Sequence, residues 1–147
     1  MTQGQPPAAD CVEMEQAYLL RGRITARVRR TSGKGARAGV KAPFRDGRLE
    51  WEWRLPDAIA RALLAAPLPR VLKRRSREGR LEIDVLEWPV GIVLVELELG
   101  PGEGPDLRDA VARVRFMEAH RPAWVHAWRD VTDDPNYTNA CLAKRRP

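Results

Sequence analysis

The segment at residues 92–99 reads Ile-Val-Leu-Val-Glu-Leu-Glu-Leu, and its second half alternates strictly between apolar and acidic side chains. A β-strand places successive side chains on opposite faces, so Glu96 and Glu98 share one face while Val95 and Leu97 share the other. Two carboxylates about 7 Å apart on one face of a strand repel each other. Such a pair can face solvent, form ion pairs with cations or bind a metal ion. The pattern alone leaves these three alternatives open.

The same two-residue period recurs along most of the chain. Its clearest instance is residues 48–55, where four ions alternate with Leu49, Trp51, Trp53 and Leu55. This alternation predicts a strand with one charged face and one dry face. Other segments with the same period are residues 12–20, 23–30, 37–41, 71–77 and 80–87. Together these segments predict an antiparallel sheet.

Two segments have helical spacing instead. Residues 57–66 carry a narrow apolar stripe between two prolines, and we expect this helix to pack against the face of Trp51 and Trp53. Residues 106–119 form a second predicted helix with Asp106 as its N-cap. Its apolar stripe consists of Leu107, Ala110, Val111, Val114 and Met117. The fold class that we expect is therefore α+β, an antiparallel sheet with a few packing helices.

The length of 147 residues fits a single domain. We expect residues 1–11 to be a disordered lead-in and residues 12–147 to be that domain. Cys11 and Cys141 are too few for a disulfide framework, so a cytoplasmic location is expected. No apolar run approaches the roughly 18 to 20 residues of a membrane span, so we expect no membrane partner.

Charge points to an anionic partner, because 26 Lys and Arg outnumber 20 Asp and Glu for a net charge of +6. The ions are sorted by strand. The basic ones are Arg27, Arg29, Lys41, Lys73, Arg75 and Arg77, the acidic ones are Glu82, Asp84, Glu96 and Glu98, and residues 48–54 are mixed. Because acidic strands lie beside the basic ones, a one-sided nucleic-acid surface is disfavoured and a small anion is expected. A homodimer is compatible with these features.

Two interpretations of the ionic face follow. In the first, the face is solvated and cross-strand pairs of opposite charge contribute modestly to stability. In the second, the sheet closes so that the ions line an interior, where cations hold a polyanion and acidic pairs hold a divalent metal ion. Mg²⁺ or Mn²⁺ would suit such carboxylates, and no Cys/His cluster offers a zinc site.

A series of short motifs, each weak alone, occurs in one order along the chain. They are Glu15-Gln16-Ala17-Tyr18-Leu19, Ala26-Arg27-Val28-Arg29, Val40-Lys41, Glu52-Trp53-Arg54-Leu55-Pro56, Val71-Leu72-Lys73-Arg74-Arg75, Glu82-Ile83-Asp84-Val85, Val95-Glu96-Leu97-Glu98-Leu99, Val131-Thr132, Asp134-Pro135-Asn136-Tyr137 and Asn139. The series resembles the CYTH domain, the triphosphate tunnel metalloenzyme superfamily, over residues 13–143. The resemblance implies an antiparallel barrel, or tunnel, whose charged lumen binds a triphosphate between basic residues, with divalent cations on acidic ones.

The resemblance also implies roles for individual residues. The triphosphate would be held by Arg27, Arg29, Lys41, Arg54, Lys73 and Arg75. The metal, Mg²⁺ or Mn²⁺, would be held by Glu96 and Glu98 with help from Glu50, Glu52, Glu82 or Asp84. Catalysis would rest on Glu96, Glu98, Lys73 and Arg75. The implied function is a metal-dependent phosphohydrolase acting on inorganic triphosphate or a triphosphate ester, and the alternative is a degenerate module that binds polyphosphate or nucleotide without turnover.

The chain departs from the family pattern at two places. Members open with a Glu-x-Glu-x-Lys strand followed by a second strand resembling Gln-Gly-Tyr-Leu, and residues 13–18 match one of these but not both. Under either assignment the usual lysine is absent, which bears on catalysis more than on phosphate binding. Relative to the family pattern, the segment at residues 106–128 resembles an insertion. We expect it to pack over one end of the barrel.

Overall fold

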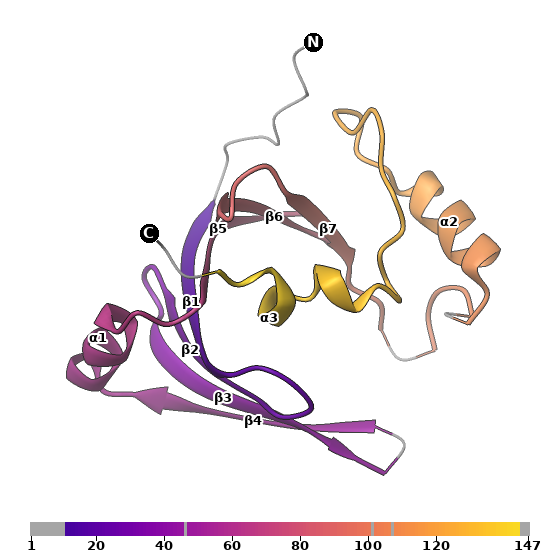
Figure 1. The fold of residues 1–147 in the computed structure, drawn as a ribbon. Coiled ribbons are helices and arrows are strands. Elements are labelled where there is room, and N and C mark those ends of the chain that lie inside the picture. The colour runs from indigo at the N-terminus through magenta and orange to yellow at the C-terminus, as the bar shows by residue number, and fades with distance from the viewer. Residues whose placement is uncertain (1–10, 46, 101, 107, 145–147) are drawn as a thin grey trace.

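The computed structural model describes residues 11–45, 47–100, 102–106 and 108–144, and these form one antiparallel sheet with short helices around it (Figure 1). The strands are β1 (Val12–Leu20), β2 (Thr25–Thr31), β3 (Gly35–Phe44), β4 (Gly47–Leu55), β5 (Arg70–Glu78), β6 (Leu81–Trp88) and β7 (Val93–Leu97). Their order across the sheet is β4-β3-β2-β1-β5-β6-β7. The sheet curls into a half-barrel, with β4 and β7 at its two edges (Figure 1). The predicted α+β class with an antiparallel sheet is confirmed.

Tight turns join β1 to β2, β2 to β3 and β3 to β4, so these four strands form successive hairpins. The turn between β2 and β3 is closed by a hydrogen bond from the Lys34 N–H to the Thr31 carbonyl oxygen, at 3.1 Å. A strand was predicted at residues 37–41, but β3 extends further, through Pro43 to Phe44. The reason is that β2 pairs with β3 only as far as Lys41, so beyond that point the missing Pro43 N–H has no neighbour to bond on that side.

Helix α1 (Asp57–Ala65) covers the convex face of the sheet, outside the curve in Figure 1. Its buried Ala60 and Leu64 pack on the small residues Ala17 and Ala36 and on Val28. These small side chains let the helix approach the backbone of the sheet closely. The helix follows β4 directly and turns back over β1–β3, so it does not cover the edge strand β4.

The expectation that α1 packs against the tryptophans of β4 is therefore wrong. Trp51 is 52% exposed and Trp53 49% exposed, and Leu49 on the same face is also exposed. The expected dry face of this strand is a solvent-facing apolar patch, because β4 is an edge strand and no element of the described chain lies over that part of the convex face.

The concave face has an apolar core of its own. Helix α3 (Asn139–Leu142) and the 3₁₀ turn η1 (Pro135–Tyr137) lie inside the curve of the sheet (Figure 1). Ala143 packs there with Tyr18, Val71, Leu86 and Leu94. Tyr18 lies directly opposite Arg27 in the ladder of β1 and β2, so this core occupies the same face as the ions. The C-terminal segment thus fills part of the concavity and leaves the rest to the charged side chains.

Helix α2 (Ala110–Ala119) is shorter than predicted and is capped by a different residue. Asp109, not Asp106, accepts hydrogen bonds from the N–H groups of Val111 and Ala112, at 2.9 and 3.1 Å. The expected apolar stripe is not buried, since Val111 and Val114 are exposed. What anchors this helix instead is an arginine on its other side.

That arginine is Arg113, which is buried. It donates hydrogen bonds to Asp130 and Asp133 at 3.1 and 2.6 Å, and so ties the helix to the chain that follows it. Within the described ranges, no helix is both long and apolar enough to cross a membrane. The predicted lead-in at residues 1–11 lies outside the described residues apart from Cys11, and so does Leu107 of the predicted stripe.

Candidate functional site

One group of ions lies on the concave face of β2, β3 and β4, and we call it the cationic cluster. Its members are Arg27, Arg29, Arg37, Lys41, Glu50 and Glu52. Arg27 Nη2 donates to Glu50 Oε1 at 3.1 Å and to Glu52 Oε1 at 3.0 Å. Arg27 on β2 reaches β4 because the residue between them in the ladder is Gly39. A Cβ atom at Gly39 would lie 3.5 Å from Arg27 Nε and 3.4 Å from Glu52 Cγ, in the path that the two side chains use.

The cationic cluster has more positive than negative charge. Its four cations share two carboxylates, which leaves an excess of two positive charges. Burial raises the pKa of Glu52, but the hydrogen bond from Arg27 and the charge of Arg29 outweigh it, so the net shift is downward and the carboxylate stays ionised. Burial also lowers the pKa of Arg29, although Glu52 opposes that shift.

Two more arginines, Arg48 and Arg54, share the concave-facing parity of β4 with Glu50 and Glu52. Within the part of the chain that the structure describes, neither Arg48 nor Arg54 forms an ion pair. The side of the sheet formed by β2–β4 is thus rich in cations that are only partly neutralised.

The other side of the concave face, on β5–β7, is neutralised. Lys73 is 3% exposed and Asp84 is 1% exposed, and Lys73 Nζ lies 2.5 Å from Asp84 Oδ2. Arg75 donates to both oxygens of Asp84, from Nε at 2.6 Å and from Nη2 at 2.7 Å. Burial raises the pKa of Asp84, but the hydrogen bond from Arg75 and the charge of Lys73 outweigh it and hold the pKa below its usual value. Glu82 pairs with Arg75 and with Arg77.

Glu96 and Glu98 also pair with arginines, which is one of the three alternatives that the sequence left open. Arg75 Nη2 lies 4.0 Å from Glu96 Oε2, and Arg77 Nη2 lies 3.8 Å from Glu98 Oε2. Their side chains are 56% and 62% exposed. Glu98 lies just beyond the end of β7, where its N–H donates to the Arg80 carbonyl oxygen at 3.0 Å. Both are therefore half-exposed ions at the rim of the sheet.

The carboxylates do not form a metal site as they lie. Among the described residues, no group of three or more His, Cys, Asp or Glu side chains is placed so that it could hold a metal ion. Glu82 and Asp84, which are buried, have their oxygens directed at Arg75, Arg77 and Lys73. Arginine and lysine donors already occupy these oxygens, so a hard divalent cation would have to displace them.

A cavity of about 1660 Å³ lies beside the cationic cluster, between the ends of β2 and β3, strand β7 and the segment that follows α2. Its volume exceeds the roughly 300–1,000 Å³ of an ordinary ligand pocket, so it is an open trough. Of the predicted site residues, Arg27, Lys41 and Glu96 line it. The predicted residues that do not line it are Arg29, Arg54, Lys73, Arg75, Glu50, Glu52, Glu82, Asp84 and Glu98.

Several arginines that line the trough were not among the predicted site residues, and two of them are on the side formed by β2–β4. Arg23 and Arg48 line it, and within the described ranges neither forms an ion pair. The signal for Arg23 was present, because Arg23 has the same alternating parity as Arg27. Arg48 likewise shares its parity with Glu50. What the sequence did not tell is that Arg23, in the turn before β2, and Arg48, near the start of β4, both line the trough.

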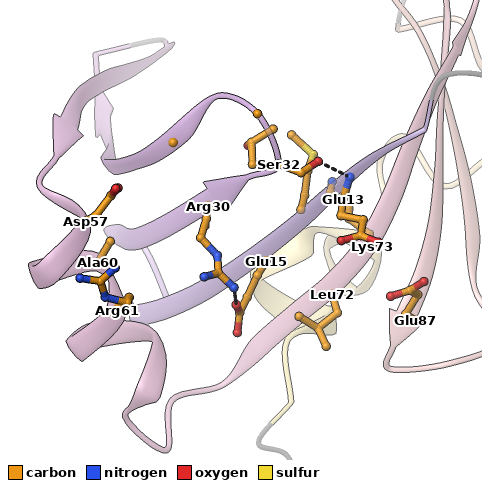
Figure 2. Close-up of a pocket in the computed structure, with 14 residues that line it drawn as sticks. Glu13, Glu15, Arg30, Ser32, Asp57, Ala60, Arg61, Leu72, Lys73 and Glu87 are labelled. Carbon is orange, nitrogen blue, oxygen red and sulfur yellow. Dashed lines mark hydrogen bonds and ion pairs between the residues drawn. The ribbon is translucent and has the colours of Figure 1, made fainter.

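A second cavity, of about 520 Å³, lies against β1, α1 and the turn after β2 (Figure 2). Glu15 lies at its wall between Arg30 and Arg70, with shortest nitrogen–oxygen distances of 3.2 and 2.9 Å. The labelled side chains in Figure 2 include four carboxylates, on Glu13, Glu15, Asp57 and Glu87. With four carboxylates against three cations (Arg30, Arg61 and Lys73), this cavity suits an anion less well than the trough does.

Comparison of the chain with protein-family models, with curated protein sequences and with solved structures found no match in any of the three.

Proposed function

We propose that this protein binds a short polyphosphate, inorganic triphosphate or a triphosphate ester, in the trough beside the cationic cluster. The observation that supports this proposal is the uneven distribution of charge over the concave face. Four cations share two carboxylates on β2–β4, whereas on β5–β7 the ions neutralise one another.

Among the cations that line the trough, Arg23, Arg27, Lys41 and Arg48 lie on the side formed by β2–β4. A polyphosphate offers several charged oxygens in a row, and guanidinium groups bind such oxygens through paired, charge-assisted hydrogen bonds. Arg23 and Arg48 would make these bonds without giving up an existing ion pair. Arg27 and Lys41 would share their donors between Glu50 and the ligand.

The proposal includes the tunnel that the CYTH resemblance implies. The curled sheet and the segment after α2 would together surround the bound anion, with the sheet supplying the charge. Lowering of the local dielectric constant by such enclosure would strengthen each ion–ligand contact.

The CYTH resemblance implies a second candidate, hydrolysis of the bound ligand with a metal ion held between carboxylates. Glu82 and Glu96 lie directly opposite each other in the ladder of β6 and β7, which is an unfavourable arrangement unless a cation lies near both. Arg75 is that cation here, with contacts to both carboxylates. We assign no step to a metal ion, because the carboxylates as they lie do not fit one.

The test is calorimetric titration of the full chain with inorganic triphosphate at low salt, for the wild type, Arg23→Ala and Arg48→Ala. Each substitution is expected to weaken binding by about 1.5 to 3 kcal/mol, the range of a hydrogen bond to a charged group. The affinity should fall as the salt concentration rises. Lys73 and Arg75 are poor probes, because replacing either one also breaks a buried pair with Asp84.

The matched control is Arg61→Ala, since Arg61 is an exposed arginine that lines the second cavity instead of the trough (Figure 2). It should leave the affinity unchanged. Absence of binding by the wild type, or an equal loss with Arg61→Ala, would contradict the proposal. A phosphate-release assay with Mg²⁺ and with Mn²⁺ then separates a hydrolase from a binding module.

A further inference from the structure

The outer edge of β4 is open. β4 is the last strand in the sheet order, and every residue from Gly47 to Arg54 is exposed. Its backbone pairs with β3 along nine consecutive positions without a shift in register. Natural edge strands are usually shortened, bulged or interrupted by proline, because a long regular edge accepts another strand. Over residues 47–55 the chain has none of these protections.

The convex side of this edge is apolar. Trp51 and Trp53 are each about half exposed, and Leu49 beside them is exposed as well. Tryptophan is among the residue types that are enriched at the anchors of protein interfaces. An apolar patch that runs along an unpaired strand suits a partner that adds a strand and covers the patch at the same time.

We propose that the partner is a second copy of this chain, with the two β4 strands paired antiparallel about a two-fold axis at Trp53. The charge pattern supports this occupant and this register. With the axis at Trp53, Arg54 of each copy faces Glu52 of the other. Within the described ranges Arg54 has no ion pair, so the second copy supplies its partner.

Other registers are less favourable. An axis at Trp51 would place Arg48 opposite Arg54 and Glu50 opposite Glu52, and like charges directly opposite each other are destabilising. An axis at Glu50 would place the two Glu50 residues of the dimer opposite each other, and an axis at Glu52 would do the same with the two Glu52 residues. The Trp53 axis avoids every like-charge pair and brings the two Trp53 rings together, a favourable cross-strand contact.

An axis at Leu49 also avoids like charges, because it places Arg48 opposite Glu50. It leaves both Trp53 side chains uncovered, however, and so buries less apolar surface. On the convex side, the Trp53 axis places Trp51 of each copy opposite Leu55 of the other. Pairing of two copies through β4 does not depend on the proposed polyphosphate function.

The experiment is sedimentation velocity of the full chain over a concentration series, for the wild type, Arg54→Glu and Arg54→Lys. The wild type is expected to show a monomer–dimer equilibrium. Arg54→Glu should raise the dimer dissociation constant at least about tenfold, because two attractive pairs become two repulsive ones. Arg54→Lys keeps the charge and should dimerise like the wild type. Val111→Lys, at an exposed apolar residue of α2, should also leave the equilibrium unchanged.

A cross-link tests the register directly. In a background with Cys11 and Cys141 changed to serine, Trp53→Cys should form a disulfide between copies under mild oxidation, since residues that face each other across the axis are within disulfide reach. A wild type that stays monomeric throughout the series overturns the proposal. So does a dimer that tolerates Arg54→Glu, or one that is cross-linked through Leu49→Cys and not through Trp53→Cys. Circular dichroism of each variant establishes that it is folded.

Discussion

Replacing Asp84 by Asn tests the reasoning about the buried ions most directly. Asp84 is 1% exposed and accepts hydrogen bonds from Lys73 and from Arg75. Asn has nearly the same volume but no charge, so Asp84→Asn leaves Lys73 as a buried cation without its counter-ion. Arg75 keeps its contact with Glu82. Removing one member of a buried pair costs about 3 to 5 kcal/mol, and the Asn side-chain oxygen can still accept one hydrogen bond, so we expect about 3 kcal/mol.

Urea unfolding followed by circular dichroism measures this loss. The midpoint should fall while the m-value stays the same, because the surface exposed on unfolding does not change. For a chain of this size, a loss of about 3 kcal/mol corresponds to a drop of roughly 6 to 12 °C in melting temperature. The matched control is Glu103→Gln, because Glu103 pairs with Arg80 on the surface. Solvent screens an exposed pair, so the control should change the midpoint little.

The pH dependence gives a second readout. The pKa of Asp84 is held below its usual value by Arg75 and Lys73, against the effect of burial. A carboxylate with a depressed pKa stabilises the folded state above its unfolded pKa of about 3.9, and this contribution is lost as the pH falls through the folded value. The difference between the wild type and Asp84→Asn should therefore be constant near neutral pH and shrink in acid. A loss below 1 kcal/mol, or one that does not change in acid, would refute the assignment of Asp84 as the buried counter-ion.

Two other substitutions test the rim of the sheet and the start of α2. Glu96→Gln with Glu98→Gln should change the free energy of unfolding by less than about 1 kcal/mol in a urea titration, because both side chains are half exposed and their arginines lie 3.8 to 4.0 Å away. A large loss would mean that this pair is a structural ion cluster. Asp109→Ala should cost about 0.5 to 2 kcal/mol as a lost N-cap, whereas Asp106→Ala should cost less, and thermal melts that show the reverse order would contradict the observed cap.

The positions of the strands were set by the sequence alone, because alternation is a local property that needs no knowledge of the rest of the fold. Residues 12–20 became β1 with the same bounds, and residues 48–55 lie within β4. The same alternation also identified which ions share a face, since side-chain parity fixes that once the strand is known. The grouping of Arg27, Arg29 and Lys41 on one surface could therefore be predicted.

The partners of those ions could not be predicted, because they depend on the order and register of strands that are far apart in the chain. Lys73 was expected to hold a phosphate, and in the structure it is buried against Asp84 across the β5–β6 ladder. The role of Gly39 is of the same kind. Its lack of a side chain matters only because it lies between Arg27 and Glu52 in a three-strand register. The phosphate-binding role of Lys73 and the metal-binding role of the carboxylates stay predictions.

The tertiary structure also decided which apolar side chains are covered. Trp51 and Trp53 have the alternating pattern of a buried strand face, yet they are half exposed because β4 is at the edge of the sheet. Sequence alternation determines that a strand has two different faces, but burial depends on what packs over each face. Helix α1 packs over Ala17, Val28 and Ala36 instead, since their small side chains and central position allow the closest approach. The local pattern determined the strands, and the long-range packing determined which surfaces of the sheet are left for a ligand or a partner.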